Sequence, residues 1–79
     1  MTAIVNIFLK EGVLDPQGKA IHHALDAMNF KGVEDVRMGK QIVLKLTSNN
    51  KEDALKEVEQ MAEDILANTV IEDYTIELR

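Results

Sequence analysis

Gly12-Val13-Leu14-Asp15-Pro16-Gln17-Gly18-Lys19-Ala20 is the stretch that decides how this chain folds, because it converts a strand into a helix. The Asp15 carboxylate is short enough to cap the free amides of a helix, and Pro16 follows at the first helical position, where its missing N–H is no loss. Gly18 costs the helix about 1 kcal/mol relative to alanine. We therefore expect Gly18 to let another surface come close, and this junction to serve docking.

Strand and helix patterns continue on both sides of the junction. Residues 3–10 alternate as a strand does, and residues 16–28 carry apolar side chains at helical spacing. Residues 33–38 and 41–47 read as two strands joined by a tight hairpin, with Gly39 supplying a positive φ. Residues 51–66 form the clearest helix, which Asn68 ends in the left-handed conformation. Residues 70–78 form the last strand.

This order of elements predicts one α+β domain over residues 1–79, a βαββαβ ferredoxin-like sandwich. Its four-stranded antiparallel sheet would hold the first and third strands in the middle and both helices on one face. The open face should be polar in a monomer, yet Ile4, Phe8 and Val43 project there. Burying these three side chains would contribute about 5–8 kcal/mol. We therefore expect self-association, or a large partner, through Ile4, Phe8 and Val43.

The net charge, the cysteine count and the lack of long apolar runs argue against several classes of function for this chain. The net charge of −5 disfavours nucleic-acid binding, because phosphate backbones would be repelled. The chain has no cysteine, which removes disulfides and thiol nucleophiles and favours the cytoplasm. No apolar run approaches the ~20 residues of a membrane span.

No group of residues has the spacing of a catalytic, cofactor or metal site. His22 and His23 are neighbours on a helix and cannot share one metal ion as an i, i+4 pair would, although His22 could pair with Asp26. Five residues separate Gly12 from Gly18, and Ala20 stands where a phosphate-binding loop needs Ser or Thr. We expect no catalytic group, bound cofactor or metal in this chain.

Two charged features leave alternatives open. Arg37 and Lys40 at the expected hairpin tip suit either contact with a partner or ligand phosphate, or a simple solvated turn. The acidic outer face of residues 51–66 is either solvated or complementary to a basic partner.

Three segments together resemble the PurS family, over nearly the whole chain and in the same order. They are Leu9-Lys10-Glu11-Gly12-Val13-Leu14-Asp15-Pro16-Gln17-Gly18, then Val33-Glu34-Asp35-Val36-Arg37-Met38-Gly39-Lys40, then Val70-Ile71-Glu72-Asp73-Tyr74. In one departure, Thr69 stands where the family usually has proline, so the turn before Val70 should be looser.

The resemblance implies a function. PurS proteins are the small subunit of phosphoribosylformylglycinamidine synthase in purine biosynthesis, with a PurL-type synthetase and a PurQ-type glutaminase. The complex, an ATP-dependent C–N ligase, converts formylglycinamide ribonucleotide, ATP and glutamine to formylglycinamidine ribonucleotide, ADP, phosphate and glutamate. This chain would not do that chemistry; ATP and magnesium belong to the synthetase. It would form homodimers or higher oligomers and bridge the other subunits so that ammonia is transferred without loss.

The resemblance also implies docking residues in three places. They are Gly12, Val13, Leu14, Asp15, Pro16, Gln17 and Gly18, then Arg37, Gly39 and Lys40, then Val70, Ile71 and Glu72. The alternative is a regulatory domain of the ACT type, which senses a small molecule at a helix N-terminus near a dimer interface. Tight binding of one amino acid or nucleotide by the isolated chain would favour that alternative.

Overall fold

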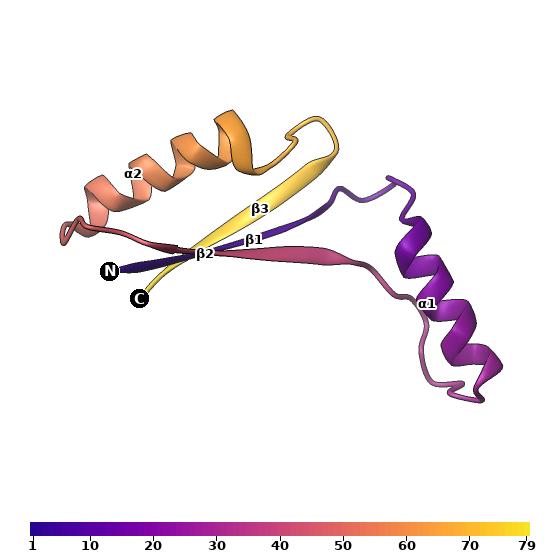
Figure 1. The fold of residues 1–79 in the computed structure, drawn as a ribbon. Coiled ribbons are helices and arrows are strands. Elements are labelled where there is room, and N and C mark those ends of the chain that lie inside the picture. The colour runs from indigo at the N-terminus through magenta and orange to yellow at the C-terminus, as the bar shows by residue number, and fades with distance from the viewer.

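The computed structural model describes residues 1–79 and contains a three-stranded sheet with two helices and one short π-helix (Figure 1). The elements, in chain order, are β1 (Thr2–Leu9), α1 (Pro16–Ala27), β2 (Gly39–Lys45), α2 (Lys51–Met61), the π-helix η1 (Ala62–Leu66) and β3 (Glu72–Leu78). The sheet order is β2-β1-β3, and both pairs are antiparallel. None of the helices has the length and apolarity that crossing a bilayer requires.

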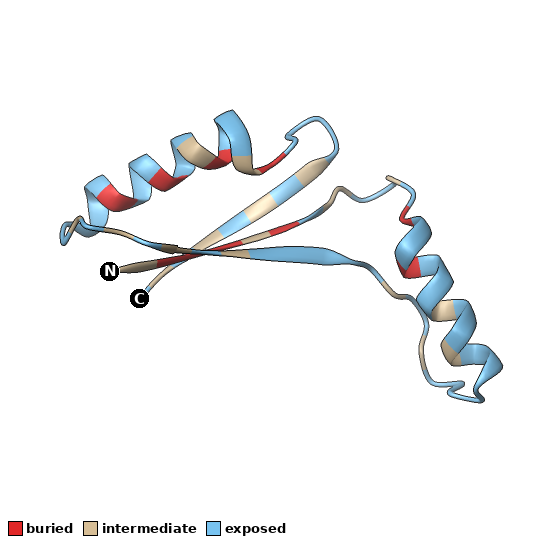
Figure 2. Ribbon diagram, in the orientation of Figure 1, coloured by how far each residue is buried: buried red, intermediate tan, exposed pale blue.

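The core lies between the sheet and α2, on one face of β1. Val5 and Ile7 of β1 are fully buried there with Val58 of α2. Ala54 of α2 and Ala62 of η1 are also buried, and their small side chains let both helical segments lie close to the sheet. The buried positions of α2 lie on its side towards the sheet (Figure 2). The N-terminus of α2 is fixed by Asn50, whose side chain accepts a hydrogen bond from the Asp53 N–H at 3.1 Å.

α1 leaves the sheet and points away from it, so that only α2 covers the core (Figure 1). The molecule measures 48 × 25 × 14 Å, and its radius of gyration is 16.0 Å. A compact domain of this length would have a radius of gyration of about 12 Å. The prediction of two helices on one face of the sheet is therefore wrong.

The predicted strand over residues 33–38 does not form, which leaves three strands where four were expected. This segment runs beside α1, and the Val33 carbonyl lies 2.8 Å from His22 Nε2. The predicted hairpin at Gly39-Lys40 is wrong as well, because Gly39 has no positive φ and begins β2 opposite Phe8. A Cβ on Gly39 would lie 2.9 Å from the Ile7 carbonyl oxygen, so this glycine serves close strand approach and not a turn.

The outer face of the sheet carries the three residues predicted to drive self-association. Ile4 lies opposite Val43 in the β1–β2 pair, and Ile4 is only 6% exposed. Phe8 and Val43 are 41% and 51% exposed. Self-association through this face stays a prediction.

Candidate docking site

The three segments predicted to dock meet at one corner of the molecule, where β1 ends and β2 and β3 begin. The Lys10 N–H donates to the Ile71 carbonyl at 2.8 Å, and Arg37 donates to the Val13 carbonyl at 3.0 Å. Lys40 Nζ lies 3.9 Å from a carboxylate oxygen of Glu72. We call residues 12–18, 37–40 and 70–72 the corner. Residues 16–38, which carry α1 away from the sheet, form the arm, and the two ends of the arm are part of the corner.

Asp15 ties the arm to the corner from both sides. One carboxylate oxygen accepts the Gly18 N–H at 2.9 Å and so caps α1, and the other accepts the Met38 N–H at 2.6 Å. The hydrogen bond from Gly18 holds the pKa of the buried Asp15 carboxyl below its ordinary value. The bond from Met38 and the nearby Arg37 charge act in the same direction, against the effect of burial. The cap was predicted from the sequence; the bond to Met38 was not.

Gly18 is the point where α1 touches the segment that returns from the arm to β2. A Cβ on Gly18 would lie 2.2 Å from the Val36 carbonyl oxygen, a distance that no real contact tolerates. The close approach expected at Gly18 is therefore confirmed, but the surface that approaches belongs to the same chain. Gly12, at φ 87°, supplies the left-handed turn between β1 and the arm.

The turn before β3 is built by Asn68. Its side chain accepts the Val70 N–H at 3.2 Å, and its carbonyl accepts the Ile71 and Glu72 N–H groups. The left-handed conformation predicted for Asn68 is wrong; the only non-glycine residue with a positive φ is Asn29, after α1. Asparagine side chains favour such turns because they replace a backbone acceptor.

The corner presents apolar side chains beside a shallow hollow. Leu14 is 64% exposed and Val70 is 82% exposed. The hollow has a volume of about 250 Å³. It is lined by Ile7, Phe8, Leu9, Asp15, Gln17, Met38, Gly39, Lys40 and Glu72. Docking at the corner stays a prediction. The structure adds that the three predicted segments lie close enough together to contact one partner.

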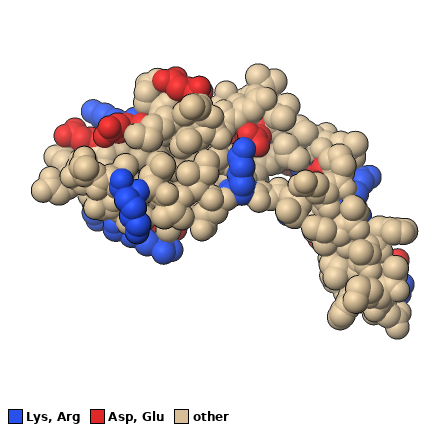
Figure 3. Space-filling view, viewed as in Figure 1, with Lys and Arg blue, Asp and Glu red and all other residues tan.

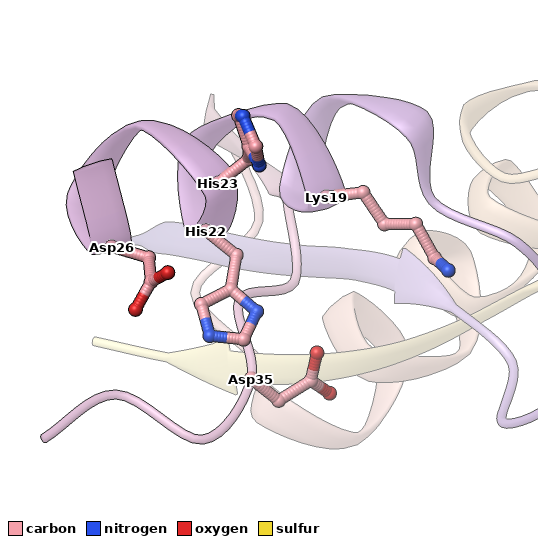
Figure 4. Close-up of a pocket in the computed structure, with 5 residues that line it drawn as sticks. All are labelled: Lys19, His22, His23, Asp26 and Asp35. Atoms are coloured by element: carbon pink, nitrogen blue, oxygen red, sulfur yellow. The ribbon is translucent and has the colours of Figure 1, made fainter. Parts of the chain in front are cut away.

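A second hollow on the arm brings together the two histidines and two carboxylates (Figure 4). His22 points towards the segment that bears Asp35, whereas His23 leaves α1 in another direction. His22 does not pair with Asp26 as predicted; its ring nitrogen lies against the Val33 carbonyl, and Asp26 pairs with Lys31 at 3.1 Å. No three potential ligands come close enough to hold a metal ion. His22 therefore helps to fix the arm.

Charge is distributed unevenly over the molecule. On the face shown in Figure 3, acidic side chains gather over α2, and basic side chains gather below the sheet. The arm carries few charged side chains on this face. Tyr74 on β3 donates to Glu63 on η1 at 2.8 Å, and this bond raises the pKa of the Tyr74 hydroxyl, with smaller contributions from burial and from nearby carboxylates.

The fold and the corner define a class of small α+β protein in which a three-stranded sheet carries a projecting helical arm. Comparisons with known proteins place the chain within that class. Residues 2–79 match the family model described as PurS: Phosphoribosylformylglycinamidine (FGAM) synthase, and the chain belongs to this family.

Relatives and solved structures agree with the family. The phosphoribosylformylglycinamidine synthase subunit PurS of Bacillus subtilis is 49% identical over 75 residues, which cover 94% of this chain and 87% of the relative. The crystal structure of PurS from Methanocaldococcus jannaschii is similar with a TM-score of 0.87 at 42% identity, over 96% of this chain and 92% of that one. A chain in the structure of PurLQS from Thermotoga maritima has a TM-score of 0.88 at 30% identity, over 96% and 93% of the two chains.

Proposed function

We propose that this chain is the small, non-catalytic subunit of a phosphoribosylformylglycinamidine synthase complex in purine biosynthesis. The family match over residues 2–79 supports the complex, and the match to the Bacillus subtilis relative covers 87% of that relative's length. The complex is an ATP-dependent ligase that takes its nitrogen from glutamine. The chain holds the other subunits in position.

The observation that carries this role is the corner. Its charged groups are used internally: Asp15 binds two backbone amides, and Arg37 donates to two backbone carbonyls. What the corner offers outward is apolar surface, chiefly Leu14 and Val70. A rigid corner with exposed apolar side chains suits protein contact, because burial of such side chains is the main favourable term in association.

The partners that this role requires are a PurL-type synthetase, a PurQ-type glutaminase and a second copy of this chain. The similarity to a chain of the Thermotoga maritima PurLQS structure supports the first two. ATP and magnesium are used by the synthetase, and this chain binds no cofactor of its own. The cysteine-free composition favours the cytoplasm as its setting.

Bridging would allow ammonia released by the glutaminase to reach the synthetase without loss to solvent. This requires a subunit whose shape is fixed and whose surface is unreactive. The two hydrogen bonds that Asp15 accepts and the close approach at Gly18 fix the shape of the chain here. The absence of cysteine removes one class of reactive side chain from its surface.

Assembly with purified partners tests the proposal. The chain is mixed with a PurL-type synthetase and a PurQ-type glutaminase, and the mass of the complex is measured by size-exclusion chromatography with light scattering. We expect one complex that contains all three proteins. Leu14→Asp should weaken it, because it places a charge in the exposed apolar part of the corner.

Leu55→Asp is the matched control, since Leu55 is also an exposed apolar residue but lies on α2. We expect this variant to assemble as the unchanged chain does. Failure of the unchanged chain to join the synthetase, or tight binding of a free amino acid by the chain alone, would overturn the proposal.

A further inference from the structure

The outer edge of β3 is a strand edge without a neighbour. The Thr2 N–H donates to the Arg79 carbonyl and the Arg79 N–H donates to the Thr2 carbonyl, both at 2.8 Å. Since such pairs alternate along an antiparallel ladder, the odd-numbered residues of β3 bond to β1 and the even-numbered ones direct their backbone groups away from it. No strand of the chain lies on that side, because the sheet order is β2-β1-β3. Tyr74, Ile76 and Leu78 therefore present free N–H and carbonyl groups along one edge.

The sequence of β3 leaves this edge open to another strand. Proteins usually protect an exposed edge with proline, lysine or a bulge. β3 contains neither proline nor lysine, and its seven residues pair with β1 one to one, without a bulge. The charges that it carries are acidic, at Glu72, Asp73 and Glu77. The edge thus accepts a strand, and its charge selects which strand.

A shallow hollow of about 360 Å³ lies beside this edge, between residues 51–66 and β3. It is lined by Lys56, Glu59, Gln60, Glu63 and Tyr74. The Tyr74 hydroxyl donates to Glu63 at 2.8 Å, and the charge of Glu59 acts on the same hydroxyl. None of the ion pairs of the chain includes Glu59, Glu63 or Lys56. The hollow therefore holds two carboxylates without a cation partner, next to an aromatic side chain.

These charges exclude one occupant of the edge and favour another. Two copies of β3 placed side by side would oppose acidic side chains to each other, and like charges directly opposite destabilise a strand pair. A basic strand instead meets Glu59 and Glu63 on one face and Asp73 and Glu77 on the other. A guanidinium group fits the hollow best, because it binds two acceptors at once and stacks on aromatic rings. The acidic side chains that gather over α2 extend the same field (Figure 3).

We propose that the glutaminase partner adds a basic, extended segment to the edge of β3, with an arginine side chain in the hollow between Glu59 and Glu63. In such strand addition, main-chain hydrogen bonds supply affinity and side-chain pockets supply specificity. The inference rests on the proposed function and adds the place and the chemistry of one contact. A bridging subunit needs two surfaces that do not overlap. With the apolar corner given to the synthetase, β3 serves the glutaminase, since it leads from the corner to the end of the sheet where both termini lie (Figure 1).

Removal of the two carboxylates is the first test. Glu59→Gln with Glu63→Gln removes both charges and keeps side chains of nearly the same size. The chain is first combined with the synthetase, and the glutaminase is then titrated into that complex. We expect the double variant to join the synthetase as the unchanged chain does, and to bind the glutaminase at least about 10-fold more weakly, because charge-assisted hydrogen bonds are lost.

Glu52→Gln with Glu57→Gln is the matched control, since both carboxylates lie on α2 and neither lines the hollow. This control should bind the glutaminase as the unchanged chain does. Added salt should weaken the unchanged chain more than the Glu59 and Glu63 variant. Equal affinity of the two double variants for the glutaminase, or a loss of synthetase binding alone, would overturn the inference. An unchanged chain that does not join the synthetase would overturn the proposed function itself.

Hydrogen exchange resolved by residue tests the edge without a substitution. In the complex of the chain with the synthetase, the amides of Tyr74, Ile76 and Leu78 should exchange rapidly, because they face solvent. The amides of Thr75 and Glu77 bond to β1 and serve as the internal reference. Addition of the glutaminase should slow the first set at least about 10-fold and leave the reference set unchanged. Exchange that stays rapid at all three edge positions would overturn strand addition.

Discussion

Replacing Gly18 by alanine should destabilise this protein, although the same change stabilises most helices. In an ordinary helix interior, glycine to alanine contributes about 0.5–1 kcal/mol of stability. Here the new Cβ would lie 2.2 Å from the Val36 carbonyl oxygen and 3.0 Å from Asp15 Oδ2. The segment that contains Val36 must retreat by about 1 Å to reach a tolerable contact.

The magnitude follows from two opposing effects. Crowding of this kind costs about 1–3 kcal/mol, because backbone cannot move aside as the end of a flexible side chain does. Retreat of Val36 also strains the hydrogen bond from the Met38 N–H to Asp15. After the ordinary gain from alanine is subtracted, we expect the free energy of unfolding to fall by about 1–2 kcal/mol.

Gly32→Ala is the matched control, since a Cβ there meets nothing within 4 Å and the φ of Gly32 is not positive. That variant should be neutral or more stable by up to about 1 kcal/mol. Both are measured by urea unfolding at one protein concentration, because association makes stability depend on concentration. A Gly18→Ala variant as stable as the unchanged chain would refute the reasoning.

Three further outcomes are expected. Because the folded pKa of Asp15 is lowered, the unchanged chain should lose stability as the pH falls from about 4 through the folded pKa. Asp15→Asn keeps the acceptor that caps α1 but places an amide against the Met38 N–H, and urea titrations should show no such pH-dependent loss in this variant. Tyr74 is the only tyrosine, so its absorbance titration should lie above the ordinary pKa of about 10 and return towards it in Glu63→Gln; an unmoved midpoint would contradict the Glu63 contact. Thr69→Pro should raise the free energy of unfolding by about 0.4–1 kcal/mol, since the Thr69 N–H makes no hydrogen bond. A lower free energy of unfolding, measured with urea, would show that the turn cannot accept proline.

Local signals predicted most of the elements. The Asp15-Pro16 pair placed the start of α1, and its carboxylate caps the helix as expected. The alternation of β1 and the helical spacing of α2 likewise appear at nearly the predicted residues. Such signals work because caps and amphipathic stripes are properties of neighbouring residues.

What could not be predicted depends on partners distant in the sequence. Residues 33–38 have the composition of a strand, but a strand also needs a neighbour. Gly39 begins β2 and does not turn the chain back, so the expected hairpin partner in the same chain is lost. Gly39 was interpreted as a turn residue because a sequence does not distinguish a glycine needed for φ from one needed for close approach. The apolar stripe of α1 requires a cover, and the sequence does not say which molecule supplies it.

The docking residues were predicted in three separate places, and nothing in the sequence indicated that these segments lie together. The structure brings them to one corner, where Asp15, Gly18 and Arg37 mainly hold the arm, and docking at this corner stays a prediction. The Met38 amide and the Val36 carbonyl, which complete that grip, are backbone groups and leave no mark in a sequence. Ile4, one of three residues expected to be open, is buried.

The most direct measurement compares two rates in the reconstituted synthase, with and without this chain. The synthetase and glutaminase are supplied in both cases, and formylglycinamidine ribonucleotide formation is followed with either glutamine or ammonia as the nitrogen source. A non-catalytic bridging subunit predicts that omitting the chain abolishes the glutamine-dependent rate and leaves the ammonia-dependent rate unchanged. Equal loss of both rates would contradict that role.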